Sequence, residues 1–412
     1  MEIALVVPSR NNLKYLQWSY ASVRKNQGSH TVYFCTADDA STDGTWEWMQ
    51  AMAEHDPYFR CIRHAGPERL GHTILYDRIV NELVTTDLAM IWHADMYMCP
   101  GALDVIEKLI ISESTKCIVS LTRIEPPLHP PGPEKVIQDF GTEPENFDEN
   151  AFLAWVHRFQ SEVKIHGRRV NKALSSNFTT DGVFAPWAFW VKEFKEIGGH
   201  DLLFAPQSKE DSDIWNRFLL NGIKFLQTWE GFVYHMTCRG SRFNPTLTTP
   251  GKNSREWEEQ NIRSTRNFIR KWGHFVKHDE YLHPIVPHKY DVAFCVKTGG
   301  IIDQLSALRL LEPWCSVLYT DMSEDIIGTY IAIEQPDTRY NLKDKIRRES
   351  PGEHDIIVDI DLSSLTKMDF DNIQLLSEIL DDNSVTGEYM LGNLKIHICS
   401  LQHRENELIV CK

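Results

Sequence analysis

The chain has 412 residues, enough for one large domain and a smaller one, and its 42% hydrophobic and 25% charged residues are typical of a folded protein. Its formal net charge of −15 disfavours nucleic acid as a partner and docking on an anionic membrane, because both need clustered Lys and Arg. No run approaches the roughly 20 apolar residues of a membrane span, and the apolar run at residues 3–7 is too short for a signal peptide. The nine scattered cysteines contain no CxxC pair, so we expect a reducing, cytoplasmic setting.

Apolar strands alternate with amphipathic segments through the first half of the chain. Predicted strands cover residues 3–7, 31–36, 59–63, 88–93 and 117–121, and predicted helices cover residues 13–26, 44–54, 72–84 and 100–111. Strands separated by helices of this length imply βαβ units in a mostly parallel, Rossmann-like sheet flanked by helices. Such sheets bind ligands beyond the carboxyl ends of their strands, and polar residues gather at those points here.

The later segments differ in composition. Residues 125–149 are rich in proline, which predicts a long irregular loop. A polar, proline-containing stretch at residues 277–287 predicts a boundary between a larger domain, 1–287, and a smaller C-terminal α/β domain, 288–412. We expect the second domain to be an accessory domain that serves ligand binding or self-association into a homo-oligomer. Its predicted strands cover residues 291–297, 316–320, 329–334, 355–360 and 394–399, and its predicted helices cover residues 301–311 and 369–380.

An acidic run, DDASTDGT at residues 38–45, follows the second strand. Ser41 or Asp43 suits the start of the following helix, because short polar side chains cap free N–H groups there. Capping does not account for the neighbouring pair Asp38 and Asp39. Carboxylates at a strand end can accept hydrogen bonds from a nucleobase and ribose, so we predict nucleotide contacts for this pair.

A second motif, His93-Ala94-Asp95, ends the strand at residues 88–93. A departing diphosphate builds up negative charge, which a divalent cation held by carboxylate or imidazole neutralises. Ligands two residues apart in an extended turn point to the same side. The motif therefore predicts a metal site, although a single histidine here is also compatible with a structural role.

The third constellation, IGGHD at residues 197–201, is followed by KEDSD at residues 209–213 and then by Arg217. Glu210 and Asp211 open an amphipathic helix, where the helix dipole favours negative charge. This placement alone would explain acidic residues. The alternative is that Asp211 is a general base that deprotonates an acceptor hydroxyl.

The fourth constellation follows a strand at residues 231–234. His235 could be a further metal ligand, and Arg239, Ser241 and Arg242 behind it suit a diphosphate clamp. A surface loop with solvated arginines explains the same residues equally well.

Together and in this order, these blocks resemble the family 2 glycosyltransferases and their GT-A relatives. The opening VVPSRNN is similar to the family's first strand, DDASTDGT to its nucleotide-binding DDGSTDGT, and HAD to its DxD metal motif. The blocks at residues 197–222 are similar to the family's GGFDE and EDxD blocks, which carry the catalytic base. The resemblance spans about residues 3–245. His93 in place of the first Asp of DxD, and Met96 in place of a frequent acidic residue, are departures from the family pattern.

The resemblance implies a GT-A catalytic domain. Such a domain transfers a sugar, with UDP-sugars favoured as donors, to a hydroxyl of a glycan or glycoconjugate in an inverting single displacement. The implied roles are catalysis by Asp211 with Glu210 beside it, and metal binding by Asp95, His235 and His93. One carboxylate and two imidazoles favour Mn²⁺ over Mg²⁺. Expected nucleotide or phosphate contacts are Pro8, Arg10, Asp38, Asp39, Arg78, Arg239, Ser241 and Arg242.

Two alternatives remain from the sequence. A sugar-phosphate nucleotidyltransferase has a related sheet but a glycine-rich loop after its first strand, whereas residues 8–12 here contain no glycine. A non-catalytic glycan-binding or scaffold protein built on a decayed transferase would account for His93 in the metal motif.

Overall fold

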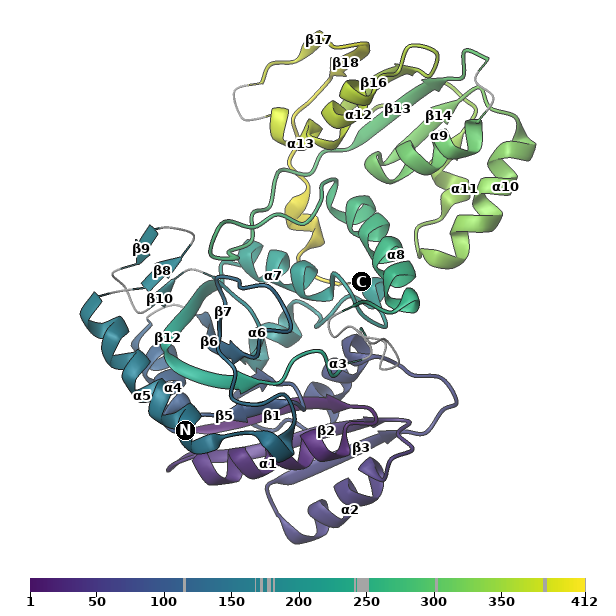
Figure 1. Ribbon diagram of the computed structural model, residues 1–412. Coiled ribbons are helices and arrows are strands. Elements are labelled where there is room, and N and C mark those ends of the chain that lie inside the picture. The colour runs from purple at the N-terminus through teal and green to yellow at the C-terminus, as the bar shows by residue number, and fades with distance from the viewer. Residues whose placement is uncertain are drawn as a thin grey trace. The chain divides into compact units, whose positions relative to one another are not determined.

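The computed structural model describes residues 1–113, 116–166, 168–170, 173–175, 179–180, 182–240, 242, 252–300, 303–380 and 384–411 (Figure 1). The chain folds into two compact units. Unit 1 comprises Met1–Gln260, His278–Ile285 and Val410–Lys412, and unit 2 comprises Asn261–Lys277 and Val286–Ile409.

The described residues of unit 1 build a ten-stranded sheet in the order β10-β12-β6-β11-β4-β1-β2-β3, with β5 beside β12 and β7 beside β6. Most pairs are parallel, whereas β5, β10 and β11 run antiparallel to their neighbours. The strands are β1 (Glu2–Ser9), β2 (Thr31–Asp39), β3 (Phe59–His64), β4 (Leu88–Ile91), β5 (Met96–Met98), β6 (Cys117–Glu125), β7 (Lys135–Ile137), β10 (Thr179–Thr180), β11 (Trp187–Trp190) and β12 (Lys224–His235). A separate hairpin pairs β8 (Arg168–Val170) with β9 (Ala173–Ser175).

Helices lie on both sides of this sheet. Alternate residues of β1, such as Leu5, share a buried apolar cluster with α1 (Leu13–Asn26), α2 (Thr45–His55) and α4 (Ala102–Ser112). Helix α3 (His72–Glu82) contacts β1 and β2 and lies on the opposite side from α1 (Figure 1). The remaining helical segments of unit 1 are η1 (Pro144–Asn146), α5 (Glu149–His166), α6 (Val191–Glu196), η2 (Leu202–Phe204) and α7 (Glu210–Leu220), and α8 (Arg255–Trp272) continues into unit 2.

The structure confirms the predicted mostly parallel sheet with flanking helices. The bounds of α1 coincide with the predicted helix, whereas β2 and β6 extend beyond their predicted ends to Asp39 and Glu125. Both extensions carry acidic side chains to the carboxyl edge of the sheet, where the candidate site lies.

The prediction of one irregular loop over residues 125–149 is wrong in part. Within it, β7 pairs in parallel with β6, and Pro144–Asn146 form a 3-10 helix. Proline removes only its own N–H from a ladder. The segment is held by ion pairs of Lys135 with Glu125 (2.9 Å) and of Arg123 with Glu134 (2.8 Å), which proline content does not reveal.

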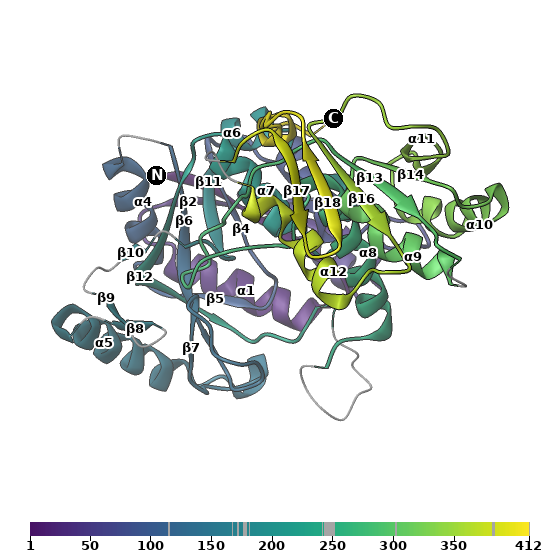
Figure 2. The ribbon, with the colours of Figure 1, turned by 90° about the horizontal axis from the view of Figure 1, so that it is seen from above.

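Unit 2 has its own apolar core and, in its described residues, a six-stranded sheet ordered β15-β14-β13-β16-β18-β17. The first four strands are parallel, and β18 and β17 form an antiparallel edge, where they lie side by side (Figure 2). The strands are β13 (Val292–Lys297), β14 (Val317–Thr320), β15 (Ile346–Arg347), β16 (Ile356–Asp361), β17 (Gly387–Leu391) and β18 (Leu394–Ile398). The helical segments are α9 (Gln304–Leu311), η3 (Glu312–Trp314), α10 (Glu324–Glu334), η4 (Gln335–Asp337), α11 (Leu342–Lys345), α12 (Lys367–Gln374), α13 (Leu376–Ile379) and η5 (Glu405–Leu408).

The smaller α/β region therefore exists, but the strand predicted at residues 329–334 is wrong. These residues end helix α10, whose first turn is capped by the Ser323 hydroxyl accepting from Ile326 N–H at 3.4 Å. Ile327 and Tyr330 are buried at helical spacing. The tertiary core thus overrides the β propensity of a short apolar run. No helix in the described part of the chain combines the length and apolar character that crossing a bilayer requires.

Candidate active site

Three predicted metal ligands come together at the carboxyl edge of the unit 1 sheet. His93 and Asp95 lie in the turn between β4 and β5, and His235 ends β12. The two strands β5 and β12 pair with Met96 opposite His235, and the Met236 N–H donates to the Asp95 carbonyl at 3.0 Å. As a result, one ligand atom each of His93, Asp95 and His235 lie within 4.8 Å of one another.

Glu125, which the sequence analysis did not single out, orients His235. Its Oε1 lies 2.7 Å from His235 Nδ1, which leaves His235 Nε2 facing Asp95 Oδ1 at 3.3 Å. Glu125 is itself paired with Lys135 at 2.9 Å and with Arg123 at 3.4 Å. A carboxylate on one imidazole nitrogen fixes the other nitrogen for metal binding. The sequence signal that could have identified Glu125 is an acidic residue at the end of a buried strand.

The electrostatics of this group favour an added positive charge. Burial lowers the pKa of His235, but the Asp95 and Glu125 carboxylates outweigh it and raise the pKa to about 9. Burial, reinforced by the charge of His235, lowers the pKa of His93 to about 3, so its imidazole is neutral. Carboxylate oxygen and neutral imidazole nitrogen are suitable ligands for divalent transition metals. The residues present therefore fit a divalent cation, which would take the place of the proton that His235 holds at its raised pKa.

Two other groups among the described residues also bring such side chains within reach of one another. They are His288, His403 and Glu405 in unit 2, and Asp201, Asp213 and Cys411 in unit 1. The rings of His288 and His403 stack at 3.6 Å with an interplanar angle of 9°, and lone pairs lying in parallel planes do not converge on one ion. Asp213 is committed to an ion pair with Arg217. The group around Asp95 is thus the stronger metal candidate.

The predicted nucleotide carboxylates end β2, beside the end of β1 that carries Pro8. The Asp38 carboxylate is fully buried and lies 3.3 Å from Arg63 Nε. It also accepts the Ser41 N–H at 3.3 Å, which ties it to the turn that leads into α2. Asp38 therefore shapes the turn, while Asp39 points toward a different segment.

Asp39 organises the loop before α3. Its two carboxylate oxygens accept the N–H groups of Leu70 (2.8 Å) and Gly71 (3.0 Å). Arg10 follows β1, and its Nη1 is buried with no hydrogen-bond partner among the described residues. Burial lowers the pKa of Arg69, and the charge of Arg10 adds to this effect. The buried Nη1 of Arg10 favours an anion near it, and Arg69, which precedes the Leu70 amide held by Asp39, was missed by the sequence analysis.

The two candidate catalytic carboxylates in the first turn of α7 have different surroundings. Glu210 Oε1 lies 2.7 Å from His72 Nε2. Burial raises the pKa of Glu210, but His72 outweighs it and the pKa falls below its usual range. Burial and the Glu210 charge together raise the pKa of Asp211 to about 7. Two carboxylates whose environments push their pKa values apart are suited to different roles, with Asp211 the better proton acceptor near neutral pH.

A buried ion pair within α7 stabilises this turn. Arg217 Nε lies 2.8 Å from Asp213 Oδ2, and both side chains are fully buried. The other two nitrogens of Arg217 donate to the carbonyls of Ile197 (2.9 Å) and Gly199 (2.6 Å). Gly199 has φ +68°, and a Cβ there would lie 2.3 Å from the Asp77 carboxylate. The glycine pair and Arg217 of this block thus hold the backbone, and Asp213 is not available as a base.

We expect Arg217→Met to lower the free energy of unfolding of unit 1 by about 3–5 kcal/mol, because it leaves Asp213 as a buried, unpaired charge. Urea denaturation followed by circular dichroism measures this loss. The matched control is Arg78→Met, which breaks an Arg–Glu82 pair at the same spacing on a partly exposed helix face. That change should cost about 1 kcal/mol or less. Equal losses in the two variants would contradict the structural role of Arg217.

The candidate phosphate-binding arginines are paired within the protein. Arg78 Nε lies 2.8 Å from Glu82. Arg239 donates to the Thr142 carbonyl and lies 3.1 Å from Glu143. Arg242 Nε donates to Asn253 at 2.7 Å, and its guanidinium lies over the Trp257 ring. Ser241 lies outside the described residues. Phosphate binding by these four residues stays a prediction.

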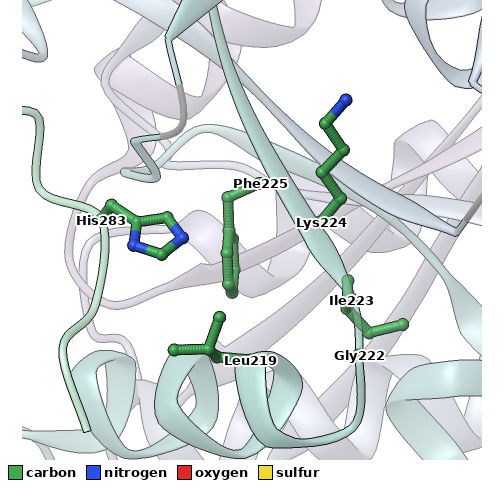
Figure 3. Close-up of a pocket in the computed structure, with 6 residues that line it drawn as sticks. All are labelled: Leu219, Gly222, Ile223, Lys224, Phe225 and His283. Carbon is green, nitrogen blue, oxygen red and sulfur yellow. The ribbon is translucent and has the colours of Figure 1, made fainter.

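A pocket of about 310 Å³ lies away from the candidate site, at the end of α7 and the beginning of β12. In Figure 3 the side chains of Leu219, Phe225 and His283 lie side by side along it. Gly222, Ile223 and Lys224 complete its lining. Asp211 and His235 are at the opposite ends of the same two elements, so this pocket is separate from the candidate site.

Comparison with known families decides the nature of the sheet domain. Residues 4–159 match the family model Glycosyl transferase family 2. This region is a family 2 glycosyltransferase domain. The match covers the ends of β1, β2 and β4, and therefore Asp38, Asp39, His93 and Asp95. The mostly parallel sheet of unit 1 with its flanking helices is consistent with the GT-A fold that the resemblance implied.

Solved structures provide a further comparison. The chain is similar to the mannosyltransferase PcManGT from Pyrobaculum calidifontis, solved in complex with GDP-Man and Mn²⁺, at 15% sequence identity and a TM-score of 0.40. The alignment covers 65% of this chain and 64% of that one, a little under two thirds of its length. A search of curated proteins finds no match.

Proposed function

We propose that this protein transfers a sugar from a nucleotide-sugar donor to a hydroxyl of a glycan or glycoconjugate, with inversion and with a divalent cation. The observation that carries the proposal is the group of His93, Asp95 and His235, whose ligand atoms lie within 4.8 Å of one another in the unit that carries the family 2 match. The first turn of α7 in the same unit offers Asp211, while the neighbouring Glu210 is engaged by His72 at 2.7 Å. A cation site and a proton acceptor are what a displacement at a sugar carbon needs.

Each group then has a defined task. Asp211 takes the proton of the acceptor hydroxyl, whose oxygen attacks the sugar carbon while the nucleoside diphosphate departs. A cation held by Asp95, His235 and His93 would supply Lewis-acid stabilisation of the diphosphate. Glu125 fixes the orientation of His235, and Arg10 with Arg69 offers positive charge beside Asp39 for the donor. Because the donor set contains two imidazoles, Mn²⁺ should serve better than Mg²⁺.

UDP-sugars are the donors proposed from the family resemblance, and residues 288–412 are proposed as an accessory domain for acceptor binding or self-association. A cytoplasmic location likewise stays a prediction.

A panel of UDP-, GDP- and dTDP-sugars tests the proposed function. Donor hydrolysis and transfer should appear with one nucleotide class, be strongest with Mn²⁺ and disappear in EDTA, with nucleoside diphosphate release as the measurement. A thermal shift with the same ligands reports binding separately, since a ligand of the native state raises its stability. Binding of glycans without nucleotide release would favour the decayed-transferase alternative. Release of pyrophosphate from a nucleoside triphosphate and a sugar phosphate would favour a nucleotidyltransferase.

A further inference from the structure

The loop before α3 joins the candidate nucleotide site to the catalytic block. At one end, Asp39 holds the Leu70 and Gly71 N–H groups at 2.8 and 3.0 Å. At the other, both the Thr73 N–H (3.4 Å) and the Thr73 hydroxyl (3.1 Å) donate to the Pro206 carbonyl, four residues before Glu210. The donor side of the site and the segment leading into α7 are therefore bridged by residues 70–73.

Gly71 makes this bridge a close one. Its φ is +82°, and a Cβ at this position would lie 2.3 Å from both the side chain and the carbonyl oxygen of Pro206. Only glycine combines this backbone conformation with such an approach. The two segments are thus packed backbone against backbone, with little room to slide.

His72, in the middle of the bridge, contacts the catalytic turn directly. Its Nε2 lies 2.7 Å from Oε1 of Glu210, a residue that is 5% exposed. The turn that His72 meets has an unusual backbone, because Ser208 and Lys209 both have positive φ, +81° and +70°. Non-glycine residues in this region cost energy and persist only where neighbouring contacts hold them. The His72–Glu210 pair is one such contact.

Helix α3 also contacts the preceding part of the block. Asp77 Oδ1 lies 2.7 Å from His200 Nδ1, and Asp77 Oδ2 accepts the His200 N–H at 2.9 Å. The Tyr76 ring stacks on the His200 ring, with centroids 5.5 Å apart. Helix α3 thus contacts both the loop around residue 200 and the start of α7.

We propose that His72 is a positioning residue of this enzyme: it holds Glu210, and through it the backbone turn that aims Asp211, while residues 70–73 link that turn to the Asp39 side of the donor site. The inference rests on the proposed function, because it assigns His72 a task in the same reaction. It also predicts that an occupied nucleotide site stabilises the catalytic turn.

The variants His72→Ala and His72→Gln separate positioning from folding. The glutamine amide can donate to Glu210, whereas alanine cannot. His72→Ala should lower kcat by about 10–100-fold, the usual cost of removing a residue that orients a reactive group, with little change in the KM for the donor. His72→Gln should recover most of kcat.

The pH profile provides a readout that a purely structural role would not move. The charged and titratable groups around Asp211 are Glu210 on its own helix, His72 and Tyr76 on α3, His200 in the preceding loop and Arg123 on β6. The positive charge of His72 partly offsets the repulsion between the Glu210 and Asp211 carboxylates. Removing that charge should raise the pKa of Asp211, so the acidic limb of the kcat profile should shift to higher pH in both variants. The matched control is His30→Ala, which removes a histidine from a 2.8 Å pair with Asp104 at the amino end of the sheet. It should leave kcat and the pH profile unchanged.

Hydrogen exchange of the amides at residues 208–213 tests the link without turnover. His72→Ala should speed exchange there, His72→Gln and His30→Ala should not, and UDP or GDP with Mn²⁺ should slow exchange in the wild type. Unchanged exchange in His72→Ala, or a kcat loss without a shifted pH profile, overturns the inference. If the wild type shows no transfer with any donor, the proposed function fails, while the exchange measurement still decides whether His72 holds the turn.

Discussion

Asp211→Asn should lower the rate of sugar transfer by about 10²–10⁴-fold while donor binding stays unchanged. An amide of the same shape cannot accept the acceptor's proton, whereas the donor is held by other residues. The structure strengthens this expectation over the sequence, because Glu210 is engaged by His72 and Asp213 by Arg217. Steady-state kinetics with the active donor, together with calorimetric titration of the nucleotide, measure the two effects.

Asp104→Asn is the matched control for this variant. Asp104 is also an acidic residue in the first turn of a helix, α4, but its partner is His30 at the amino end of the sheet. Its loss should leave turnover unchanged. Near wild-type turnover in Asp211→Asn would refute the assignment and make Glu210 the next candidate.

The pH dependence of the wild type follows from the same carboxyl group. A general base must be ionised to act, and burial with the Glu210 charge raises the pKa of Asp211 to about 7. The rate of transfer should therefore be full above that value and fall as pH drops through it. A carboxylate with an ordinary pKa near 4 would keep its activity down to about pH 5.

The second large effect is expected at the metal site. Asp95→Asn should abolish the increase in nucleotide affinity that Mn²⁺ confers and lower transfer by about 10²–10³-fold, since a cation's stabilisation of the leaving diphosphate amounts to several kcal/mol. His235→Ala should weaken the Mn²⁺ effect. His93→Asp, which supplies a second carboxylate, should be tolerated and should shift preference toward Mg²⁺.

Calorimetric titration of UDP and GDP into each variant, with and without Mn²⁺, measures these changes. Asp87→Asn is the control, because Asp87 is an exposed residue just before β4, at the opposite end of the strand from Asp95. Nucleotide binding by the wild type that is equally tight in EDTA would show that the proposed metal site does not exist. Arg10 and Arg69 would then have to hold the diphosphate.

Local periodicity in the sequence predicted the fold class and many of the elements of both sheets. Apolar runs and amphipathic spacing predicted the alternating elements, including α1 at its observed bounds and the start of α7 at Glu210. They failed at residues 329–334, where a short run of β-branched residues supports either helix or strand and the core of unit 2 decides. Motif order also predicted that His93, Asp95 and His235 would meet, which the pairing of β5 with β12 brings about.

The sequence by itself thus determined the fold class, the family and the principal candidate residues, because these depend on patterns within a few residues along the chain. Only the tertiary structure decided which side chains form hydrogen bonds and ion pairs with one another. Glu125 reaches His235 across 110 positions, and His72 reaches Glu210 across 138. Such partners leave no local signal, since a hydrogen bond depends on where the sheet and helices bring two segments together. For the same reason the sequence did not reveal that Glu210 pairs with His72 and Asp213 with Arg217, contacts that support the choice of Asp211 as the proposed base.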